Sequence, residues 1–329
     1  MRAIVQHGYG APAQVLELRD DVDKPEVADV GVLVRVHASS LNSGDWRRVL
    51  ADPFLVRLME GLRRPKTRLL GGDAAGVVEA VGKDVTDISV GDEVYGLRTG
   101  AYGEYVSGQS FVSKPHNLTF EEAAAVPVAG CTALQAVRDR GNVRPGHKVL
   151  INGAGGGVGT FAVQIAKAFG AEVTATTSTG NIDLVRSIGA DHVIDYTHED
   201  FTKQGRRYDV IIDCGGKPSI AAFRRALAAD GTLVLVAAGK GAFGALGRFS
   251  GSQVRRRVLK QPVVTFIASG PYKENLLALK ELIEAGKVKP VIDRTYPLSE
   301  IADAVAYAAT ERARGKVVIS ISGAGEPAE

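Results

Sequence analysis

The sequence predicts an α/β protein in which a doubly wound parallel sheet is combined with a second domain that is rich in β-strands. Two observations predict this fold class. In the middle of the chain, at residues 119–269, short apolar runs alternate with segments of helical periodicity, as expected of parallel strands joined by helices. Residues 1–118 hold strand-like runs separated by glycine instead.

The parallel sheet is expected to have six strands, because the middle of the chain holds six short apolar runs. Helical patterns lie between several of these runs and end at or near a glycine, a residue that often terminates helices. The expected strands are 148–152, 172–176, 192–194, 209–213, 232–237 and 263–268, and the expected helices are 161–169, 182–188 and 219–229. Such a sheet is covered by helices on both faces.

The two ends of the chain carry the remaining expected elements. Strands are expected at 31–36, 75–81 and 91–95 near the N-terminus. Near the C-terminus we expect helices at 274–285 and 299–310, a strand near Val291 and a last strand at 316–321. The tail at 323–329 is expected to be disordered.

A glycine-rich segment follows the first apolar run of the predicted parallel sheet. It reads Gly-Ala-Gly-Gly-Gly-Val-Gly, and the expected cofactor contacts are Gly153, Gly156, Gly157, Val158 and Gly159. Glycines let the backbone turn tightly beside a pyrophosphate, and the next helix presents free N–H groups to the anion. A plain surface turn is the alternative, but the strand before and the helix and strand after favour a dinucleotide site.

The composition is that of an ordinary globular enzyme. Of the 329 residues, 45 % are hydrophobic and 23 % are charged, and the net charge of +3 is too small to indicate nucleic acid. The two cysteines, Cys131 and Cys214, are too few for a disulfide framework or a four-cysteine zinc site. The sequence shows neither a signal-peptide pattern nor an apolar run that would span a membrane, so we expect a cytoplasmic protein.

Over nearly its whole length, the chain resembles the medium-chain dehydrogenase/reductase superfamily. The segments that carry this resemblance are 71–82, 90–96, 124–135 and 313–318, together with the glycine-rich segment. The resemblance implies a GroES-like catalytic domain made of residues 1–118 and 270–329. It also implies an inserted Rossmann domain, residues 119–269, that binds the nicotinamide cofactor.

The zinc-dependent members of this superfamily place metal ligands at positions that this chain fills differently. The matching positions hold Asn42, Gly72 and Val128, which cannot form a zinc site, and a nearby Cys131 is expected to be a small buried residue. We therefore expect no metal and a resemblance to the zinc-independent quinone oxidoreductases and enoyl reductases. Without a Lewis acid, hydride transfer to an already electrophilic quinone or enone is the easier reaction, because hydrogen-bond donors suffice for the delocalised charge.

The cofactor is expected to be NADPH rather than NADH. NAD sites hold a carboxylate at the end of the second strand, where this chain has Ser178, and a hydroxyl suits a 2′-phosphate better. By resemblance, Tyr196 approaches that phosphate, Thr132 lies beside the nicotinamide and Lys316 lies near the pyrophosphate. A loop serine, a helix-start hydroxyl and a solvated lysine are the structural alternatives for Ser178, Thr132 and Lys316.

The candidate catalytic residues are Asn42, Trp46 and Tyr102. By resemblance, Asn42 donates its amide to the substrate oxygen or to the nicotinamide ribose. Trp46 would stack on a flat substrate or pack as an ordinary aromatic residue, and Tyr102 would supply a proton unless bulk water does so. Asp45 is expected to be structural, and Asp73 has no assigned role.

Two segments mix arginine with large apolar residues, at 54–70 and 247–260. They are expected to be surface helices with solvated charges. A mobile cap over a hydrophobic substrate is the functional alternative, and a membrane or nucleic-acid patch is a third.

These observations together predict an NADPH-dependent, metal-independent reductase of a small hydrophobic or aromatic conjugated substrate. A ketone or aldehyde reductase without zinc and a non-catalytic NADPH-binding interaction protein are the alternatives. We expect no nucleic-acid or membrane partner. The resemblance implies a homodimer, with strands 232–237 and 263–268 as candidates for its contact.

Overall fold

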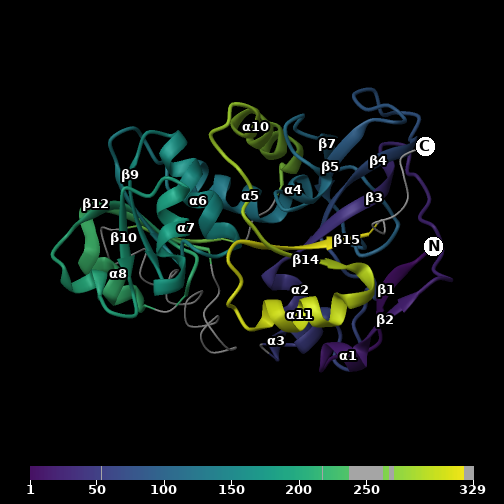
Figure 1. The fold of residues 1–329 in the computed structure, drawn as a ribbon, viewed down its shortest axis with the longest axis horizontal. Coiled ribbons are helices and arrows are strands. Elements are labelled where there is room, and N and C mark those ends of the chain that lie inside the picture. Colours follow the sequence, from purple (N-terminus) through teal and green to yellow (C-terminus); the bar gives the residue numbers. More distant parts are fainter. Residues whose placement is uncertain (53, 217, 237–261, 267–269, 322–329) are drawn as a thin grey trace. The chain divides into compact units, whose positions relative to one another are not determined.

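The computed structural model describes residues 1–52, 54–216, 218–236, 262–266 and 270–321. The chain forms two compact units (Figure 1). The first contains residues 1–128, 270–284 and 290 onward, and the second contains residues 129–269 and 285–289. The predicted basic segment at 247–260 and the predicted disordered tail at 323–329 lie outside the described residues.

The second unit is built around a six-stranded parallel sheet, as predicted. Its strands lie in the order β10-β9-β8-β11-β12-β13. Their bounds are β8 (Lys148–Asn152), β9 (Glu172–Thr177), β10 (His192–Asp195), β11 (Tyr208–Asp213), β12 (Leu227–Leu235) and β13 (Val263–Thr265). The chain runs outward from β8 to β10 and then returns to β11, so the strand order reverses between β8 and β11. In doubly wound sheets, ligands bind outside the carboxyl ends of the strands at such a point.

The helices of the second unit differ from the prediction at two places. Helix α6 (Gly157–Ala168) begins inside the glycine-rich segment, four residues earlier than expected, with Gly156 as its N-cap. Helix α8 (Ile220–Ala226) ends earlier than expected because Leu227 is already paired with β11 at Tyr208. The unit also contains α7 (Ile182–Ser187), the π-helix η1 (Gln135–Arg140) and the 3-10 helices η2 (Thr179–Asn181) and η3 (Phe201–Lys203), while α5 (Pro127–Leu134) begins in the first unit.

The first unit contains two β-sheets. Strands β1 (Ala3–Gln6) and β2 (Leu16–Arg19) form an antiparallel pair. The larger sheet has the order β14-β15-β3-β4-β5-β7, and β6 pairs with β3 beside this path. Its strands are β3 (Val32–Leu41), β4 (Asp73–Val81), β5 (Glu93–Leu97), β6 (Tyr105–Gly108), β7 (Phe111–Ser113), β14 (Ile292–Pro297) and β15 (Lys316–Ser320). Because β15 pairs with β3, the end of the chain completes the N-terminal sheet.

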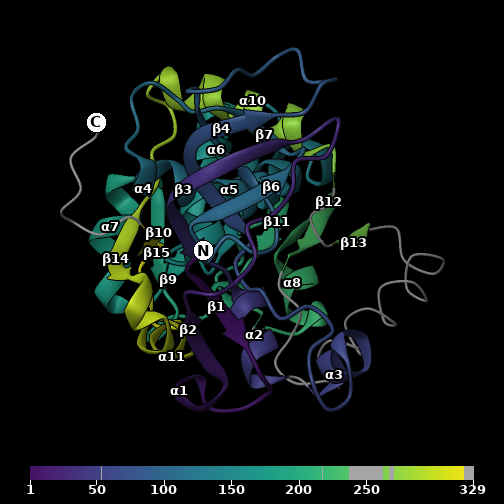
Figure 2. The same cartoon turned by 90° about the vertical axis from the view of Figure 1, so that its right-hand side faces the viewer.

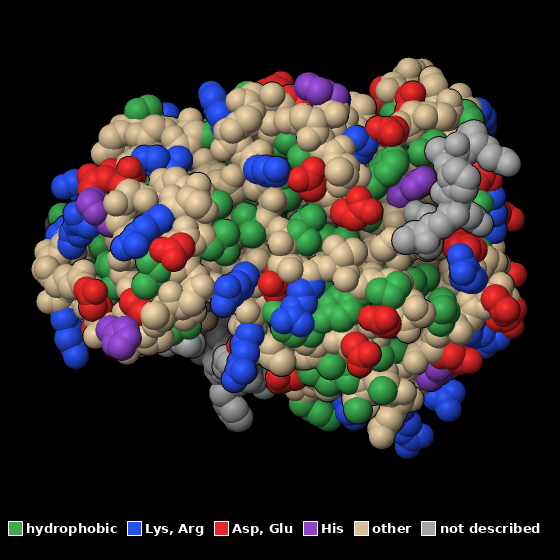
Figure 3. Space-filling model, in the orientation of Figure 1, with side chains coloured by type: hydrophobic (Ala, Val, Ile, Leu, Met, Phe, Trp, Pro, Cys, Tyr) green, Lys and Arg blue, Asp and Glu red, His purple; other side chains and the backbone are tan. Residues whose placement is uncertain are grey.

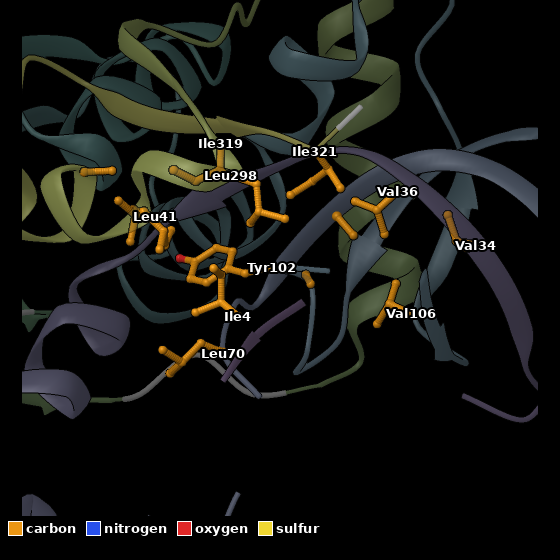
Figure 4. Close-up of a cluster of buried hydrophobic side chains, with 14 of the residues drawn as sticks. Ile4, Val34, Val36, Leu41, Leu70, Tyr102, Val106, Leu298, Ile319 and Ile321 are labelled. Atoms are coloured by element: carbon orange, nitrogen blue, oxygen red, sulfur yellow. The ribbon is translucent and has the colours of Figure 1, made fainter. Parts of the chain in front are cut away.

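Short helices cover the sheets of the first unit. They are α1 (Pro12–Val15), α2 (Ser43–Leu50), α3 (Leu55–Glu60), α4 (Phe120–Ala124), α10 (Tyr272–Glu284), the 3-10 helix η4 (Leu298–Glu300) and α11 (Ile301–Ala309). Helix α3 lies beside α2, which it follows in the chain (Figure 2). Helix α11 packs against α2. The hydrophobic core of this unit joins the larger sheet to these helices, and Figure 4 shows Ile4, Leu41, Leu70 and Ile319 within it.

Candidate active site

Asn42, Gly72 and Val128 occupy the positions that match the zinc ligands of the superfamily. These three residues lie close together in the first unit. Asn42 caps the N-terminus of α2, directly after β3, and Gly72 directly precedes β4. A Cβ atom built on Gly72 would lie 3.7 Å from Cγ2 of Val128 and 4.0 Å from Nδ2 of Asn42. The three residues that match the zinc-ligand positions in the sequence are therefore also neighbours in the structure.

The residues at this place do not fit a zinc ion. An amide, a glycine and a valine replace the thiolate and imidazole ligands that zinc prefers. Asp73 is the nearby carboxylate, and within the described ranges no group of three His, Cys, Asp or Glu side chains is arranged to hold a metal ion. The polar side chains at this place instead form hydrogen bonds with one another.

Asp73 is the centre of this hydrogen-bonded cluster. It is the first residue of β4 and is fully buried. Its Oδ2 accepts from the Ser40 hydroxyl at 2.6 Å and from Nδ2 of Asn42 at 2.8 Å, and its Oδ1 accepts from the backbone N–H of Val128 at 2.8 Å. Such donors satisfy a carboxylate that has no contact with water.

Lys316 supplies the positive charge of the cluster. Its side chain is 3 % exposed, and its ammonium donates to the Leu41 carbonyl at 2.9 Å and to Oδ1 of Asn42 at 2.6 Å. The same ammonium lies 3.4 Å from Oδ2 of Asp73. The structure thus contradicts the alternative of a solvated lysine, because the side chain is buried and its N–H donors are directed at protein oxygen atoms, whereas the pyrophosphate contact stays a prediction.

Asp45 and Tyr102 form the other side of the cluster. Oδ2 of Asp45 accepts from the backbone N–H of Asn42 at 2.8 Å and from the Tyr102 hydroxyl at 3.1 Å. Burial, followed by the nearby charge of Asp73, raises the pKa of Asp45 from 3.8 to about 6. Burial also raises the pKa of Tyr102 well above its usual value. The expected structural role of Asp45 agrees with its place in the capping box of α2.

Two of the predicted catalytic side chains belong to the hydrophobic core. Tyr102 has no exposed surface and lies among Ile4, Leu41 and Leu70 (Figure 4). Trp46 is 7 % exposed and packs in the same core, with the Arg47 guanidinium 4.5 Å from its ring centre. The prediction that Tyr102 donates a proton to the substrate is not retained, because its hydroxyl is turned to Asp45. Trp46 packs as an ordinary aromatic residue does, and its stacking on a substrate stays a prediction.

In the glycine-rich segment of the second unit, the backbone conformation favours glycine at one position and the close approach of α6 to the loop requires it at another. Gly153 has a φ of +81°, a conformation that favours glycine. A Cβ atom on Gly159 would lie 2.2 Å from the Gly153 carbonyl oxygen, so α6 approaches the loop too closely for any side chain. A Cβ atom on Gly156 would meet only that same oxygen at 3.7 Å, which leaves open space where the helix begins. Gly157 and Val158 form the first turn of α6.

A buried polar chain joins three strand ends beside this loop. Thr176 donates its hydroxyl to Oδ1 of Asn152 at 2.6 Å, and Nδ2 of Asn152 donates to Oδ1 of Asp213 at 2.7 Å. The Asp213 carboxylate also accepts from the backbone N–H groups of Gly215 and Gly216. Sequence reasoning missed these residues, although each is a polar residue at or next to the carboxyl end of its strand.

The predicted 2′-phosphate residues lie together at the ends of two neighbouring strands. Ser178 follows β9 and Tyr196 follows β10, and the backbone N–H of Tyr196 donates to the Thr177 carbonyl. Next to them, Asp195 accepts hydroxyl hydrogen bonds from Thr179 and Thr197. These bonds hold the pKa of Asp195 below its usual value. Thr132, the other predicted cofactor residue, lies in α5 and is 8 % exposed.

The segment at 54–70 forms a helix only at α3. Phe54, Leu58 and Leu62 are each about three-fifths exposed, at 62, 59 and 61 %. On the face that Figure 3 shows, basic and acidic side chains are interspersed. Among the described helices, none is long and apolar enough to cross a membrane.

Comparisons with known proteins agree with this arrangement. Two family models match: the alcohol dehydrogenase GroES-like domain at residues 28–163 and the zinc-binding dehydrogenase domain at residues 188–319. The chain is 35 % identical to the 2-methylene-furan-3-one reductase of Solanum lycopersicum over 97 % of its own length and 79 % of that protein. It is 34 % identical to the NADPH-dependent alkenal/one oxidoreductase of Arabidopsis thaliana, with coverage of 97 % and 79 %.

A solved structure of a quinone oxidoreductase is also similar to this chain. The quinone oxidoreductase from Coxiella burnetii matches with a TM-score of 0.85 and 30 % identity, over 98 % of this chain and 99 % of that one. The chain therefore belongs to the medium-chain dehydrogenase/reductase superfamily, in the branch that resembles quinone oxidoreductases and enoyl reductases.

Proposed function

We propose that this protein is an NADPH-dependent, metal-independent reductase that delivers hydride to a conjugated acceptor, a quinone or an enone. The observation that supports this most is the amide of Asn42, held at the superfamily's metal position by Lys316 and Asp73. Relatives named as reductases of alkenals, quinones and a methylene-furanone agree with a small hydrophobic or aromatic conjugated substrate.

In this proposal, Asn42 stabilises the charge that develops on the acceptor oxygen. When bound, NADPH supplies the hydride, and the conjugated system carries the electron pair onto that oxygen. Nδ2 of Asn42 has two N–H groups, of which one donates to Asp73 and the other is available to the oxygen. A fixed donor of this kind lowers the barrier because it needs no rearrangement during the reaction.

The proton that completes the reduction comes from water in this proposal. Two hydroxyls of the hydrogen-bonded cluster, those of Ser40 and Tyr102, belong to fully buried residues and donate to Asp73 and Asp45, respectively. An enolate or hydroquinone oxygen is basic enough to take its proton from solvent, so no buried side chain is required to give one up.

The preference for NADPH rests on the ends of β9 and β10. Ser178 and the exposed Tyr196 offer hydroxyl groups to a 2′-phosphate, and the nearby Asp195 is engaged by two threonine hydroxyls. The open space at Gly156 and the N-terminus of α6 suit the pyrophosphate. We expect KM for NADPH to be at least about tenfold lower than for NADH, and the reverse order would contradict this part of the proposal.

The substitution Asn42→Ala tests the role of the amide. We expect kcat/KM for the acceptor to fall about a hundredfold, the usual cost of losing one oxyanion donor, while the dissociation constant of NADPH changes little. Asn117→Ala in the same unit is a matched control, because Asn117 bonds a backbone carbonyl of α10 and is remote from Asp73 in the hydrogen-bond network. Unchanged kinetics of Asn42→Ala would remove the amide from the reaction.

A substrate panel separates the proposal from its alternatives. Turnover of quinones and enones with NADPH supports it, turnover of simple ketones or aldehydes alone favours a carbonyl reductase, and tight NADPH binding without any turnover favours an interaction protein. A homodimer in the cytoplasm completes the proposal, and light scattering coupled to size exclusion measures the oligomeric state.

A further inference from the structure

A buried ammonium group lies behind the amide of Asn42. Lys316 is the first residue of β15, and the neighbouring Val317 pairs with Leu41 of β3, which brings the side chain to the start of α2. The ammonium donates to Oδ1 of Asn42 at 2.6 Å, the shortest of its three contacts. Burial lowers the pKa of Lys316, and Asp73 opposes that change.

The contacts of the amide allow it only one orientation. Oδ1 of Asn42 faces the ammonium, and Nδ2 faces Oδ2 of Asp73 at 2.8 Å. Rotation of the amide by half a turn would set its NH2 group against the ammonium and its oxygen against the carboxylate. Both contacts would then be repulsive, so the pair of charges fixes which end of Asn42 is the donor.

The ammonium also strengthens the donor. A positive charge on the carbonyl oxygen of an amide draws electron density from its nitrogen, so the N–H groups become better donors. Hydrogen bonds that share a buried chain polarise one another in this way, by roughly 10–30 % per bond. Here the chain runs from the Lys316 ammonium through the Asn42 amide, within a cluster that contains the buried Asp73 and Ser40.

We infer that Lys316 is a positioning residue of the reaction, which takes over part of the task of the absent metal by orienting and polarising the Asn42 amide. Asp73 balances its charge and holds the other end of the same amide. This inference rests on the proposed function, because it assigns the amide as the donor to the acceptor oxygen.

The variant Lys316→Met tests the inference, since methionine keeps the length of the side chain without the charge. We expect kcat to fall by about tenfold to a hundredfold, as is usual when a partner of a catalytic group is lost, with little change in the NADPH dissociation constant. Lys316→Arg, which keeps the charge, should recover part of kcat. A rise in the NADPH dissociation constant at unchanged kcat would instead assign Lys316 to the cofactor and overturn the inference.

A double-mutant cycle distinguishes this role from a merely structural one. In the Asn42→Ala background, Lys316→Met should change kcat by less than about twofold, because the group through which Lys316 acts is gone. If Lys316→Met lowers kcat by the same factor in both backgrounds, the two residues act independently and the inference is wrong. Thermal melting of each variant is measured first, to establish that it folds. If Lys316→Met alone does not fold, it is replaced by the double variant Lys316→Met/Asp73→Asn, which removes both charges of the ion pair.

A measurement without turnover separates this inference from the proposed function. With isotope-labelled asparagine, the side-chain NH2 signal of Asn42 is identified by its loss in Asn42→Ala. We expect Lys316→Met to shift that signal and to accelerate its exchange with water, whereas an unshifted signal would contradict the contact. If the wild-type protein reduces no conjugated acceptor, the proposed function fails while the amide orientation is still tested.

Discussion

At the scale of single residues, we expect substitution of Asp73 to have the largest effect on stability. It is fully buried, and it pairs with Lys316 while it accepts hydrogen bonds from Ser40, Asn42 and Val128. Its removal would leave the buried Lys316 ammonium without its ion-pair partner, which is far more costly than the loss of an exposed ion pair.

We expect Asp73→Ala to lower the free energy of unfolding by about 3–5 kcal/mol, as measured by urea denaturation. Asp87→Ala is the control, because Asp87 is an exposed partner of Lys273 in the same unit and its loss should cost less than about 1 kcal/mol. If Asp73→Ala and Asp87→Ala lower the free energy of unfolding equally, the buried Asp73 cluster contributes no more to stability than an exposed ion pair, and the prediction is wrong.

Asp45 predicts a pH dependence of stability. Its pKa is raised from 3.8 to about 6 in the folded protein, so the folded state holds a proton that the unfolded state has already released. The contribution of this group to stability is therefore present below about pH 4 and is lost as the pH rises to about 6.

We expect the variant Asp45→Asn, which cannot titrate, to gain in melting temperature relative to the wild type as the pH rises from about 4 to about 7. The difference between the two proteins is measured by thermal melting at each pH, so that titrations elsewhere in the chain cancel. A constant difference over this range would mean that Asp45 does not titrate in it.

At the scale of elements, the glycine-rich turn between β8 and α6 combines two requirements. Gly159 has no room for a side chain, because a Cβ atom would lie 2.2 Å from a backbone oxygen. Gly156 has room for one, so the fold itself does not demand glycine there. A bound pyrophosphate that approaches the backbone would explain why this position carries no side chain.

Gly159→Ala and Gly156→Ala should therefore have different effects. We expect Gly159→Ala to lower the melting temperature by several degrees, because α6 and the loop must move apart, and Gly156→Ala to leave it nearly unchanged. In contrast, Gly156→Ala should weaken NADPH binding, measured by cofactor fluorescence. If Gly156→Ala destabilises the protein and binds NADPH normally, the assignment of this turn to the cofactor is wrong.

The elements also show which features a sequence pattern can predict. The six strands of the parallel sheet were predictable, because most of them contain a short run of apolar residues and buried parallel strands need such runs. The start of α6 was not, because glycine disfavours helices, yet α6 begins at Gly157. Residues 227–229 carry a helical pattern, yet pairing with β11 prevails from Leu227 onward.

At the scale of the whole molecule, the candidate site shows the limit of sequence reasoning. The pattern identified Asn42 and Lys316 separately, but they are 274 residues apart and meet only because β15 pairs with β3. Side-chain direction decided the remaining cases: the buried Tyr102 hydroxyl donates to Asp45, and the Lys316 ammonium points to an amide rather than to solvent. Neither direction can be obtained from spacing along the chain.

At the scale of the whole molecule, the proposed reaction requires no metal ion. One of the two matching families is described as zinc-binding dehydrogenases, yet Asn42, Gly72 and Val128 provide no ligand set for zinc. Under the proposed function, hydrogen-bond donors rather than a metal ion stabilise the charge that develops on the conjugated acceptor.

The most direct test is the rate of NADPH oxidation by an enone or quinone before and after exhaustive dialysis against a strong chelator, with the metal content measured on the same sample. We predict the same rate in both samples, less than about one-tenth of an equivalent of zinc per chain, and a loss of about a hundredfold in Asn42→Ala. Loss of activity on dialysis that zinc restores would contradict the account.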